Sequence, residues 1–276
     1  MVLNFTKMEG CGNDYIYVDC LAGLSFDPAA ASVALSPRHF AVGADGLICI
    51  CHSDVADARM RMFNADGSEG AMCGNGIRCV AQWLYEHGLA QDEVKVETRA
   101  GIKALRRMGD GLWQVEMGKA SFAPGDLPAT GFGDGPAIQK ELMVGGRAWP
   151  VTCVSVGNPH CVTRVADVAG VDLAKIGPGF EHHMAFPEGV NTEFIQVLGP
   201  DRLKMRVWER GSGETLACGT GASASVAACV AEGLCRPDQD VRVDLLGGSL
   251  TIRVGSDWRV LMTGPARTAF TGTANI

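Results

Sequence analysis

The sequence lacks the segments that direct a protein to nucleic acid, to a membrane or out of the cell. Its 276 residues carry a formal net charge of −7 and give a pI of about 5.4, whereas nucleic acids and anionic membranes require basic surface patches. The opening residues MVLNFTKMEG lack a basic n-region followed by an apolar h-region, so we expect no signal peptide. No apolar run approaches the roughly 18 residues of a membrane span. These absences favour a cytoplasmic protein.

Cysteine is plentiful, but the patterns of a disulfide framework or a zinc site are missing. The count of 11 is odd and no C-x-x-C pair occurs, so we expect reduced thiols and no metal. The nearest approach to a metal motif, Cys49-Ile50-Cys51-His52, lies in an apolar run that predicts a buried strand. We therefore interpret its cysteines as core residues. With 47% hydrophobic and 20% charged residues, the chain predicts a globular enzyme of the reducing cytosol.

The sequence contains an internal repeat at an offset of 145 positions. A CG-x-G motif begins at Cys73 and again at Cys218, and the same offset carries Gly12-Asn13 onto Gly157-Asn158. Residues 59–76 lie over residues 204–221 without a gap. Six residues recur in the two segments, namely Met60, Arg61, Glu69, Cys73, Gly74 and Gly76, as Met205, Arg206, Glu214, Cys218, Gly219 and Gly221. Several motif pairs at one offset indicate two halves of one design.

The pattern between these motifs predicts an α+β fold of two pseudo-symmetric lobes. Each CG-x-G turn precedes a helical stretch, 75–87 or 220–232, closed by Gly88 or Gly233. Short apolar or alternating segments predict strands at 14–19, 59–63, 93–98, 112–118, 151–156, 191–198, 203–208, 241–246, 249–254 and 258–263. A Pro- and Gly-rich stretch at 123–136 predicts a linker. We expect an N-terminal lobe over 1–120 and a C-terminal lobe over 121–263, each a sheet wrapped around its helix, with the active site in the cleft between them.

The position of the two cysteines points to acid–base chemistry. A thiol at a helix N-terminus is expected to have a lowered pKa, because unpaired N–H groups and the helix dipole favour negative charge there. The N–H groups of Gly74-Asn75 and Gly219-Thr220 are suited to holding a substrate carboxylate. If Cys73 and Cys218 flank one α-carbon, a proton removed from one face and returned to the other inverts that carbon. Such a reaction needs no metal and no pyridoxal cofactor.

Polar residues at repeat-equivalent turns are further candidates. Asn13 and Asn158 match at the offset, and Asn191 opens an apolar strand. Glu209-Arg210 ends a predicted strand, and Glu209 lies opposite Asn64 in the repeat. An arginine at this place would suit a second carboxylate, which its planar fork binds bidentately.

Two other functions are compatible with parts of the sequence. GTGASA at 219–224 satisfies the G-x-G-x-x-A pattern of dinucleotide-binding proteins, but its glycines follow a polar loop and the first copy reads GNGIRC. A pair of non-catalytic lobes, as in a periplasmic receptor, is disfavoured by the paired thiols and by the expected lack of a signal peptide.

Four blocks of the sequence together resemble one known family. GCGNDYIYVD (10–19), NADGSEGAMCGNGIRC (64–79), GNPHCV (157–162) and ERGSGETLACGTGA (209–222) are similar to the signature blocks of the diaminopimelate epimerase family, in order across nearly the whole chain. The resemblance implies two similar α/β lobes, with segment 264–276 returning to the first lobe. It implies interconversion of LL- and meso-2,6-diaminoheptanedioate in lysine biosynthesis, without pyridoxal phosphate. Asn75, where proline racemase-like enzymes have histidine, favours the epimerase.

The resemblance also implies roles for individual residues. Cys73 and Cys218 correspond to the two bases, and the amides of Gly74, Asn75, Gly219 and Thr220 to the carboxylate site. The rest of the substrate is expected to contact Asn13, Asn64, Asn158, Asn191, Glu209 and Arg210, and His160 and Glu209 are expected to influence the cysteine pKa values. Gly46 stands where many members have glutamine, so we leave it out of the site. The implied partner is the small-molecule substrate, with no cofactor and no metal. The acidic composition predicts no nucleic-acid or membrane partner. Because homodimers are common among enzymes, we also expect a homodimer.

Overall fold

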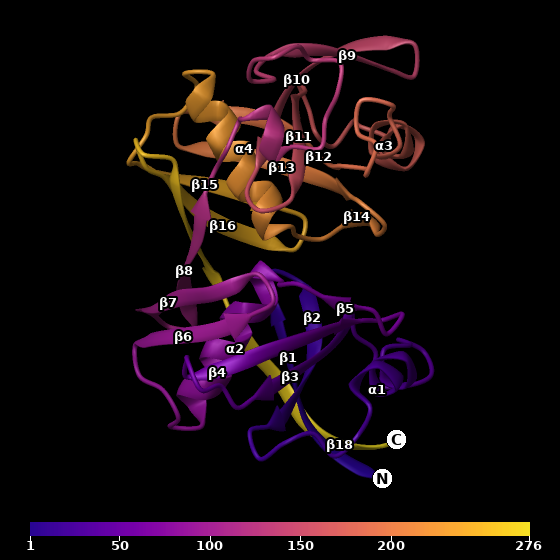
Figure 1. The fold of residues 1–276 in the computed structure, drawn as a ribbon, viewed down its shortest axis with the longest axis vertical. Coiled ribbons are helices and arrows are strands. Elements are labelled where there is room, and N and C mark those ends of the chain that lie inside the picture. Colours follow the sequence, from indigo (N-terminus) through magenta and orange to yellow (C-terminus); the bar gives the residue numbers. More distant parts are fainter. The chain divides into compact units, whose positions relative to one another are not determined.

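The computed structural model describes residues 1–276, and the chain divides into two compact units. The first unit, here the N-terminal unit, comprises Met1–Glu116 together with Thr263–Ile276, and the C-terminal unit comprises Met117–Met262 (Figure 1). The chain passes from one unit to the other within strands β8 (Leu112–Lys119) and β17 (Arg259–Pro265). Both units combine a mixed sheet with helices, so the predicted α+β class is confirmed.

The N-terminal unit is a twisted sheet in which neighbouring strands are mostly antiparallel. The strands pair in the order β18–β1–β2–β3–β4–β6–β7–β8, and only β2/β3 and β4/β6 are parallel. A two-residue strand, β5 (Glu69–Gly70), pairs with β4. The remaining bounds are β1 Val2–Gly10, β2 Asn13–Cys20, β3 Gly46–Cys51, β4 Ala58–Asn64, β6 Glu93–Thr98, β7 Gly101–Gly109 and β18 Arg267–Asn275.

The C-terminal unit repeats this topology. Its strands pair in the order β9–β10–β11–β12–β13–β15–β16, again with two parallel pairs, β11/β12 and β13/β15. The short β14 (Gly213–Thr215) pairs with β13, as β5 does with β4. The bounds are β9 Lys140–Val144, β10 Arg147–Ser155, β11 Pro159–Arg164, β12 Asn191–Gly199, β13 Arg202–Glu209, β15 Asp240–Leu245 and β16 Gly248–Val254.

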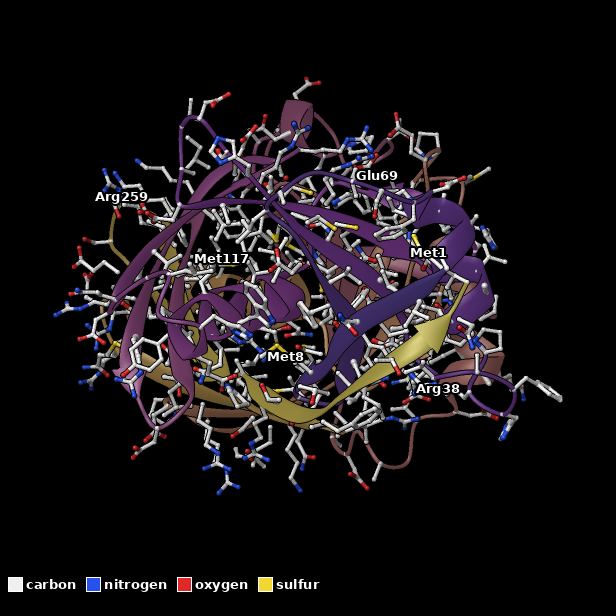
Figure 2. The ribbon with its side chains drawn as sticks, turned by 90° about the horizontal axis from the view of Figure 1, so that it is seen from below. Met1, Met8, Arg38, Glu69, Met117 and Arg259 are labelled. Carbon is white, nitrogen blue, oxygen red and sulfur yellow. The ribbon has the colours of Figure 1, made fainter.

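Each unit holds one long helix at its centre. Helix α2 (Gly74–Glu86) and helix α4 (Gly219–Ala231) are buried along most of their length, and both lie within one residue of the predicted helices. Figure 2 shows α2 surrounded by strands of the N-terminal unit. Each helix ends in a Schellman motif: Gly88 and Gly233 have left-handed φ angles of 69° and 74°, and Leu89 and Leu234 donate to the carbonyls of Leu84 and Cys229.

Two shorter helices extend the repeat beyond what the sequence pattern predicted. Helix α1 (Pro28–Leu35) and helix α3 (Leu173–Glu181) begin after N-cap residues Asp27 and Asp172, which are separated by the same 145 positions. The Asp27 side chain accepts hydrogen bonds from two backbone N–H groups of the first turn, and the Asp172 side chain accepts from one. The expectation of a single helix in each half was therefore incomplete.

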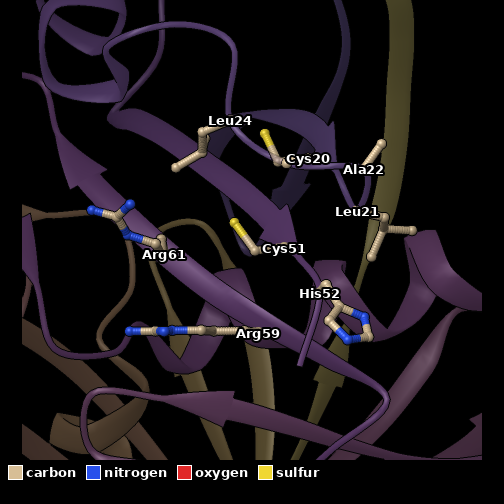
Figure 3. A pocket seen from close by; sticks show the side chains of 9 residues that line it. Cys20, Leu21, Ala22, Leu24, Cys51, His52, Arg59 and Arg61 are labelled. Carbon is tan, nitrogen blue, oxygen red and sulfur yellow. The ribbon is translucent and has the colours of Figure 1, made fainter. Parts of the chain in front are cut away.

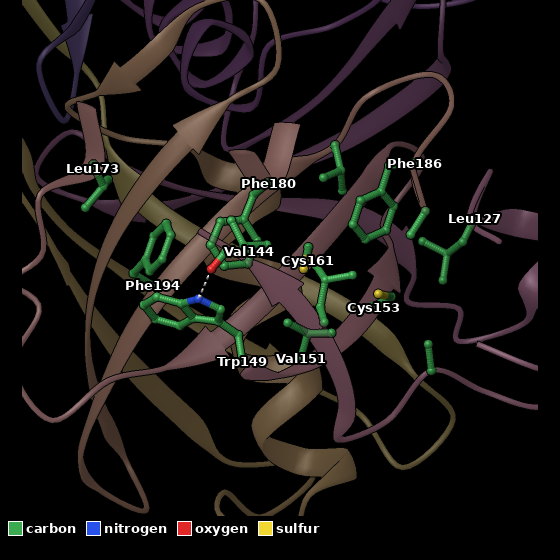
Figure 4. Close-up of a cluster of buried hydrophobic side chains, with 14 residues drawn as sticks. Leu127, Val144, Trp149, Val151, Cys153, Cys161, Leu173, Phe180, Phe186 and Phe194 are labelled. Atoms are coloured by element: carbon green, nitrogen blue, oxygen red, sulfur yellow. Dashed lines mark hydrogen bonds between the residues drawn. The ribbon is translucent and has the colours of Figure 1, made fainter. Parts of the chain in front are cut away.

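The stretch 123–136 is not a linker, and the prediction that it joins two lobes was wrong. It lies inside the C-terminal unit and contains a 3₁₀ turn, η1 (Pro124–Asp126). The next residue, Leu127, is 3% exposed and belongs to the core that packs Trp149, Phe180 and Phe194 together (Figure 4). The Trp149 indole N–H donates to the Val144 carbonyl within this core. Apolar burial therefore fixes the segment despite its turn-rich composition.

Candidate active site

Cys73 and Cys218 occupy the same structural position in their two units. Each is the N-cap residue of a central helix, with φ and ψ of −127° and 120° for Cys73 and of −123° and 112° for Cys218. Each sulfur accepts a hydrogen bond from the third residue of its helix, Gly76 or Gly221, at 3.3 Å. The first two N–H groups of these helices, at Gly74-Asn75 and Gly219-Thr220, have no carbonyl partner within the helix. Each unit therefore presents one thiol beside a helix N-terminus, where an anion is favoured.

The last glycine of each CG-x-G motif is required by close packing. A Cβ on Gly76 would lie 2.8 Å from Ile48 Cδ1, and a Cβ on Gly221 would lie 2.6 Å from Glu193 Oε1. Ile48 and Glu193 are themselves repeat equivalents on strands β3 and β12. The absence of a side chain lets each helix start directly against a strand, which fixes the position of the cysteine before it.

Arginine–glutamate pairs join the two strands that lead into each cysteine turn. The Arg61 guanidinium donates to Glu69 through Nε at 2.8 Å, and Arg206 donates to Glu214 in the same way at 2.7 Å. In both pairs Nη2 donates to the second carboxylate oxygen. The repeat therefore extends to the contacts that support the turns.

In the N-terminal unit, Asn13 lies directly against the Cys73 sulfur. The thiol donates to Asn13 Oδ1 at 3.1 Å, and Asn13 Nδ2 donates to Asp45 at 2.6 Å. Asp45 in turn accepts from Arg38 at 2.7 Å. Asn13 is the first residue of β2. The strand fixes its backbone, and the hydrogen bonds with Cys73 and Asp45 fix its amide.

Asn64, the other side chain of this unit predicted to bind substrate, does not belong to that network. It ends β4, and its amide donates to the Ser68 hydroxyl at 3.0 Å. Its strand partner is Gly46, where a Cβ would lie 2.1 Å from the Phe63 carbonyl oxygen. A side chain at 46 is therefore excluded by this backbone.

In the C-terminal unit, the predicted residues form one connected polar network. Cys218 Sγ lies 3.4 Å from the Thr220 hydroxyl, which accepts from Asn158 Nδ2 at 3.5 Å. Asn158 Oδ1 lies 3.0 Å from His160 Nε2, and His160 Nδ1 lies 2.7 Å from Glu193. His160 and Glu193 are both fully buried, so the imidazole has a fixed orientation.

Glu209 contacts the Cys218 thiol, and the neighbouring Arg210 contacts Asn191 through its backbone. The Glu209 carboxylate accepts hydrogen bonds from the Thr215 hydroxyl and the Cys218 thiol. Burial raises the pKa of Glu209 above its ordinary value. The Arg210 backbone N–H donates to Asn191 Oδ1 at 3.0 Å, and the exposed Arg210 side chain donates to the Glu188 carbonyl at 2.9 Å. No ion pair forms between Glu209 and Arg210.

The expectation of a lowered thiol pKa was wrong for Cys218. Burial raises the pKa of Cys218 well above 9, and the negative charges of Glu209 and Glu193 raise it further. The hydrogen bonds with Thr220 and with the Gly221 N–H favour the thiolate but do not offset these effects. Burial of a charge next to two carboxylates therefore outweighs the helix N-terminus, and Cys218 is a protonated thiol in this structure.

Sequence reasoning missed three buried polar residues around the cysteines. Arg78 is fully buried and donates to the carbonyls of Gly74 and Pro265 and to Asn75 Oδ1. Glu193 lies behind His160, and its Oε2 makes no hydrogen bond. Tyr15 forms hydrogen bonds with Asn13 and Cys73. For Arg78 and Glu193 the available signal was a charged residue inside an apolar helix or strand, since such residues are rarely buried without a partner. Tyr15 gave no such signal.

A separate hollow of about 420 Å³ lies elsewhere in the N-terminal unit (Figure 3). Cys20 and Cys51 are paired residues at the ends of β2 and β3, and they line it together with Arg59 and Arg61. It lies at the opposite end of β2 from Asn13. Strand β3 contains the fully buried Cys49, as predicted, whereas His52 is exposed. The structure has no group of three metal-ligating side chains, and none of its helices has the length and apolar character to cross a bilayer.

Solved structures share this fold over nearly the whole chain. A phenazine biosynthesis protein of the PhzF family from Bacillus anthracis aligns with a TM-score of 0.75 and 18% identity, covering 100% of both chains. A hydroxyproline epimerase from Agrobacterium vitis aligns with a TM-score of 0.71 and 15% identity, covering 99% of this chain and 92% of its own. The chain therefore belongs to the class of two-unit α+β proteins with this fold, and within that fold it carries a cysteine at the start of each central helix.

Closer relatives identify the family. The diaminopimelate epimerase family model matches residues 5–123 and 152–269. Diaminopimelate epimerase from Agathobacter rectalis is 49% identical over 99% of this chain and 100% of its own length, and diaminopimelate epimerase 1 from Nostoc sp. is 50% identical over 99% of both. The chain belongs to the diaminopimelate epimerase family.

Proposed function

We propose that the protein interconverts LL- and meso-2,6-diaminoheptanedioate, as an isomerase of lysine biosynthesis. The observation that carries this proposal is the pair of cysteines at repeat-equivalent helix N-termini, in a chain that belongs to this family. The helix N-termini supply the positive field that a substrate carboxylate needs. The thiols supply groups that can both give and take a proton.

The reaction moves one proton off the α-carbon and another onto it. One cysteine, as the thiolate, breaks the Cα–H bond and becomes a thiol, and the electron pair is delocalised into the adjacent carboxylate. The N–H groups of Gly74-Asn75 and Gly219-Thr220 stabilise the charge that develops there. The second cysteine gives its proton to the opposite face and becomes the thiolate, so no oxidant, reductant or cofactor is consumed. The raised pKa of Cys218 suits it to begin as the proton donor.

The remaining predicted residues bind the rest of the substrate. Asn13, which contacts Cys73, and Asn158, which contacts Thr220, border the reacting centre. Asn64, Asn191 and Glu209 offer polar atoms to the amino groups. Arg210 binds the distal carboxylate: its side chain is exposed, and a guanidinium carries five N–H donors, which match two carboxylate oxygens. His160 acts on the thiol of Cys218 through Asn158 and Thr220.

The proposal also covers the location of the protein, in the cytoplasm, and its assembly, as a homodimer. The acidic composition and the 11 cysteines, all free in the structure, support a place in the reducing cytosol. A homodimer is proposed because closed twofold dimers are the commonest oligomers.

Replacing the cysteines tests the proposal. We expect Cys73→Ala and Cys218→Ala each to lower the epimerisation rate by at least about 10²–10⁴-fold, the usual contribution of a positioned acid or base, while the circular dichroism spectrum stays unchanged. The matched control is Cys229→Ala, a buried cysteine inside α4. The readout is inversion of the LL-substrate together with incorporation of deuterium at the α-carbon in D₂O.

Two outcomes would contradict the proposal. Wild-type rates in either alanine variant would exclude the two-base mechanism. Binding of NADH by the wild-type protein, without α-hydrogen exchange, would favour the dinucleotide-binding alternative.

A further inference from the structure

One face of strand β2 lies along the start of helix α2. Side chains two positions apart in a strand point to the same side, and here Asn13, Tyr15 and Tyr17 share a face. Asn13 accepts from the Cys73 thiol at 3.1 Å, and the Tyr17 hydroxyl donates to the Gly76 carbonyl at 3.2 Å. Tyr15 stands between them and is 5% exposed. Its ring is therefore held against the turn that contains Cys73.

The Tyr15 hydroxyl makes hydrogen bonds with two side chains, one on its own strand and one in this turn. Its partners are the Asn13 side chain and the Cys73 sulfur. Burial raises the pKa of Tyr15 well above 10, and the nearby Cys73 and Asp45 raise it further. The phenol is therefore uncharged at neutral pH and has a proton to donate to the sulfur.

Glycine at position 46 leaves room for this ring. Gly46 is the partner of Tyr15 in the parallel pair β2/β3. A Cβ at position 46 would lie 3.0 Å from Tyr15 Cε1, in addition to its clash with Phe63. This chain therefore combines a missing side chain at 46 with a phenol at 15.

The repeat places a different residue at the same point in the other unit. Tyr15 lies 145 positions before His160, and each follows an asparagine by two positions. His160 contacts the buried carboxylate of Glu193 at 2.7 Å, whereas the equivalent of Glu193 is Ile48. The N-terminal unit therefore has a phenol where the C-terminal unit has the imidazole, and an isoleucine where it has the carboxylate.

We propose that Tyr15 is a positioning residue for Cys73: its hydroxyl donates a hydrogen bond to the sulfur, fixes the sulfur at the helix N-terminus and stabilises the thiolate. This deepens the proposed function, on which its role in the reaction rests. A hydrogen bond to a charged acceptor is stronger than one to a neutral acceptor, so it favours the thiolate over the thiol.

Other ionisable groups surround this turn and have to be separated from Tyr15. Tyr17 lies on the same strand, and Cys79 and Arg78 lie on α2. Asp45 reaches the turn through Asn13, and Glu9 at the end of β1 accepts from the Gly12 N–H at 2.9 Å. Tyr17 is the matched control, because its hydroxyl bonds to a backbone carbonyl of the same turn and Tyr17→Phe removes the same single oxygen atom.

The experiment measures the pH dependence of Cys73 alkylation by iodoacetamide in the substrate-free protein. Trypsin releases Cys73 in a peptide, Met62–Arg78, that contains no other cysteine, so mass spectrometry reads this thiol alone. We expect Tyr15→Phe to move the midpoint upward by about one pH unit, the shift given by one hydrogen bond to a charged group. Tyr17→Phe leaves the midpoint in place. At pH values below the midpoint, kcat/KM of Tyr15→Phe falls about tenfold, in proportion to the thiolate.

An unchanged midpoint in Tyr15→Phe overturns the inference, and so does an equal shift in Tyr17→Phe. Because alkylation is measured without substrate, either result leaves the proposed epimerisation standing. Conversely, wild-type protein that fails to exchange the α-hydrogen in D₂O overturns the proposed function and not the hydrogen bond.

Discussion

At the scale of single residues, the two cysteines share a backbone position but not an environment. Cys73 contacts an amide and a phenol, whereas Cys218 is 5% exposed and lies beside the carboxylates of Glu209 and Glu193. A helix N-terminus favours the thiolate in both cases. The nearby charges and the extent of burial decide the protonation state of Cys218, and these differ between the halves.

Removing the charge of Glu209 is expected to lower the pKa of Cys218, because the Glu209 carboxylate is the largest contribution after burial. In Glu209→Gln, the alkylation midpoint of Cys218 therefore moves to lower pH. Epimerisation falls in this variant, because a polar substrate contact is lost. Tandem mass spectrometry of the tryptic peptide Gly211–Arg242, in which the Arg236–Pro237 bond resists trypsin, gives the midpoint. The control is Glu214→Gln, a carboxylate paired with Arg206. A midpoint that stays in place or rises would exclude this electrostatic account.

At the scale of elements, a short two-stranded segment leads into each cysteine turn. Pairs β4–β5 and β13–β14 have the same antiparallel pairing, and each has an arginine–glutamate pair across it. The surroundings again differ. Arg206 Nη1 also donates to the carbonyls of Val168 and Val171, at 2.9 and 2.7 Å, so it joins the hairpin to the segment before α3.

Arg206→Met is therefore expected to destabilise the protein more than Arg61→Met. A partly exposed ion pair contributes about 0–1 kcal/mol, and each additional hydrogen bond contributes about 0.5–1.5 kcal/mol. The Arg206 variant should lose about 1–3 kcal/mol more, because two carbonyls lose their donor. Urea denaturation of the two variants gives the comparison. Equal losses would show that the carbonyl contacts contribute nothing measurable.

At the scale of the whole molecule, the two ends of the chain belong to one sheet. Strand β18 pairs with β1 along its length, and the Ile276 N–H donates to the Met1 carbonyl at 2.9 Å. Figure 2 shows the yellow C-terminal strand next to Met1. Phe5 and Phe270 are in edge-to-face contact, with ring centroids 5.9 Å apart. The last strand therefore covers the first and completes the N-terminal unit.

The continuity of the sheet is expected to matter more than the order of the chain. A circular permutant that joins residues 276 and 1 by a short Gly/Ser linker, with new ends between Gly133 and Asp134 in an exposed loop, should fold and keep its activity. Deletion of 267–276 leaves β1 as an unprotected edge and exposes Phe5, so its melting temperature should fall. Thermal unfolding with an activity assay compares the two. A permutant less stable than the deletion would contradict this view.

The sequence by itself determined the parts of the structure that local signals specify. The spacing of CG-x-G turns, the apolar stretch behind each and the closing glycines predicted both central helices to within one residue, because caps and periodicity act within a few residues of the chain. The predicted strands are all present. The repeat also brought Cys73 and Cys218 to attention, since equivalent sequences adopt equivalent turns.

Only the tertiary structure decided the features that depend on residues far apart in the chain. Strand β18 has a mostly exposed polar sequence and exists because β1 pairs with it. Leu127 made a turn-rich segment part of the core rather than a linker. Burial keeps Cys218 in the thiol form. Folding also brings Glu193 next to His160 and Tyr15 next to Cys73. A single sequence cannot show these features, because the free energy of a charge depends on the neighbours that folding brings to it.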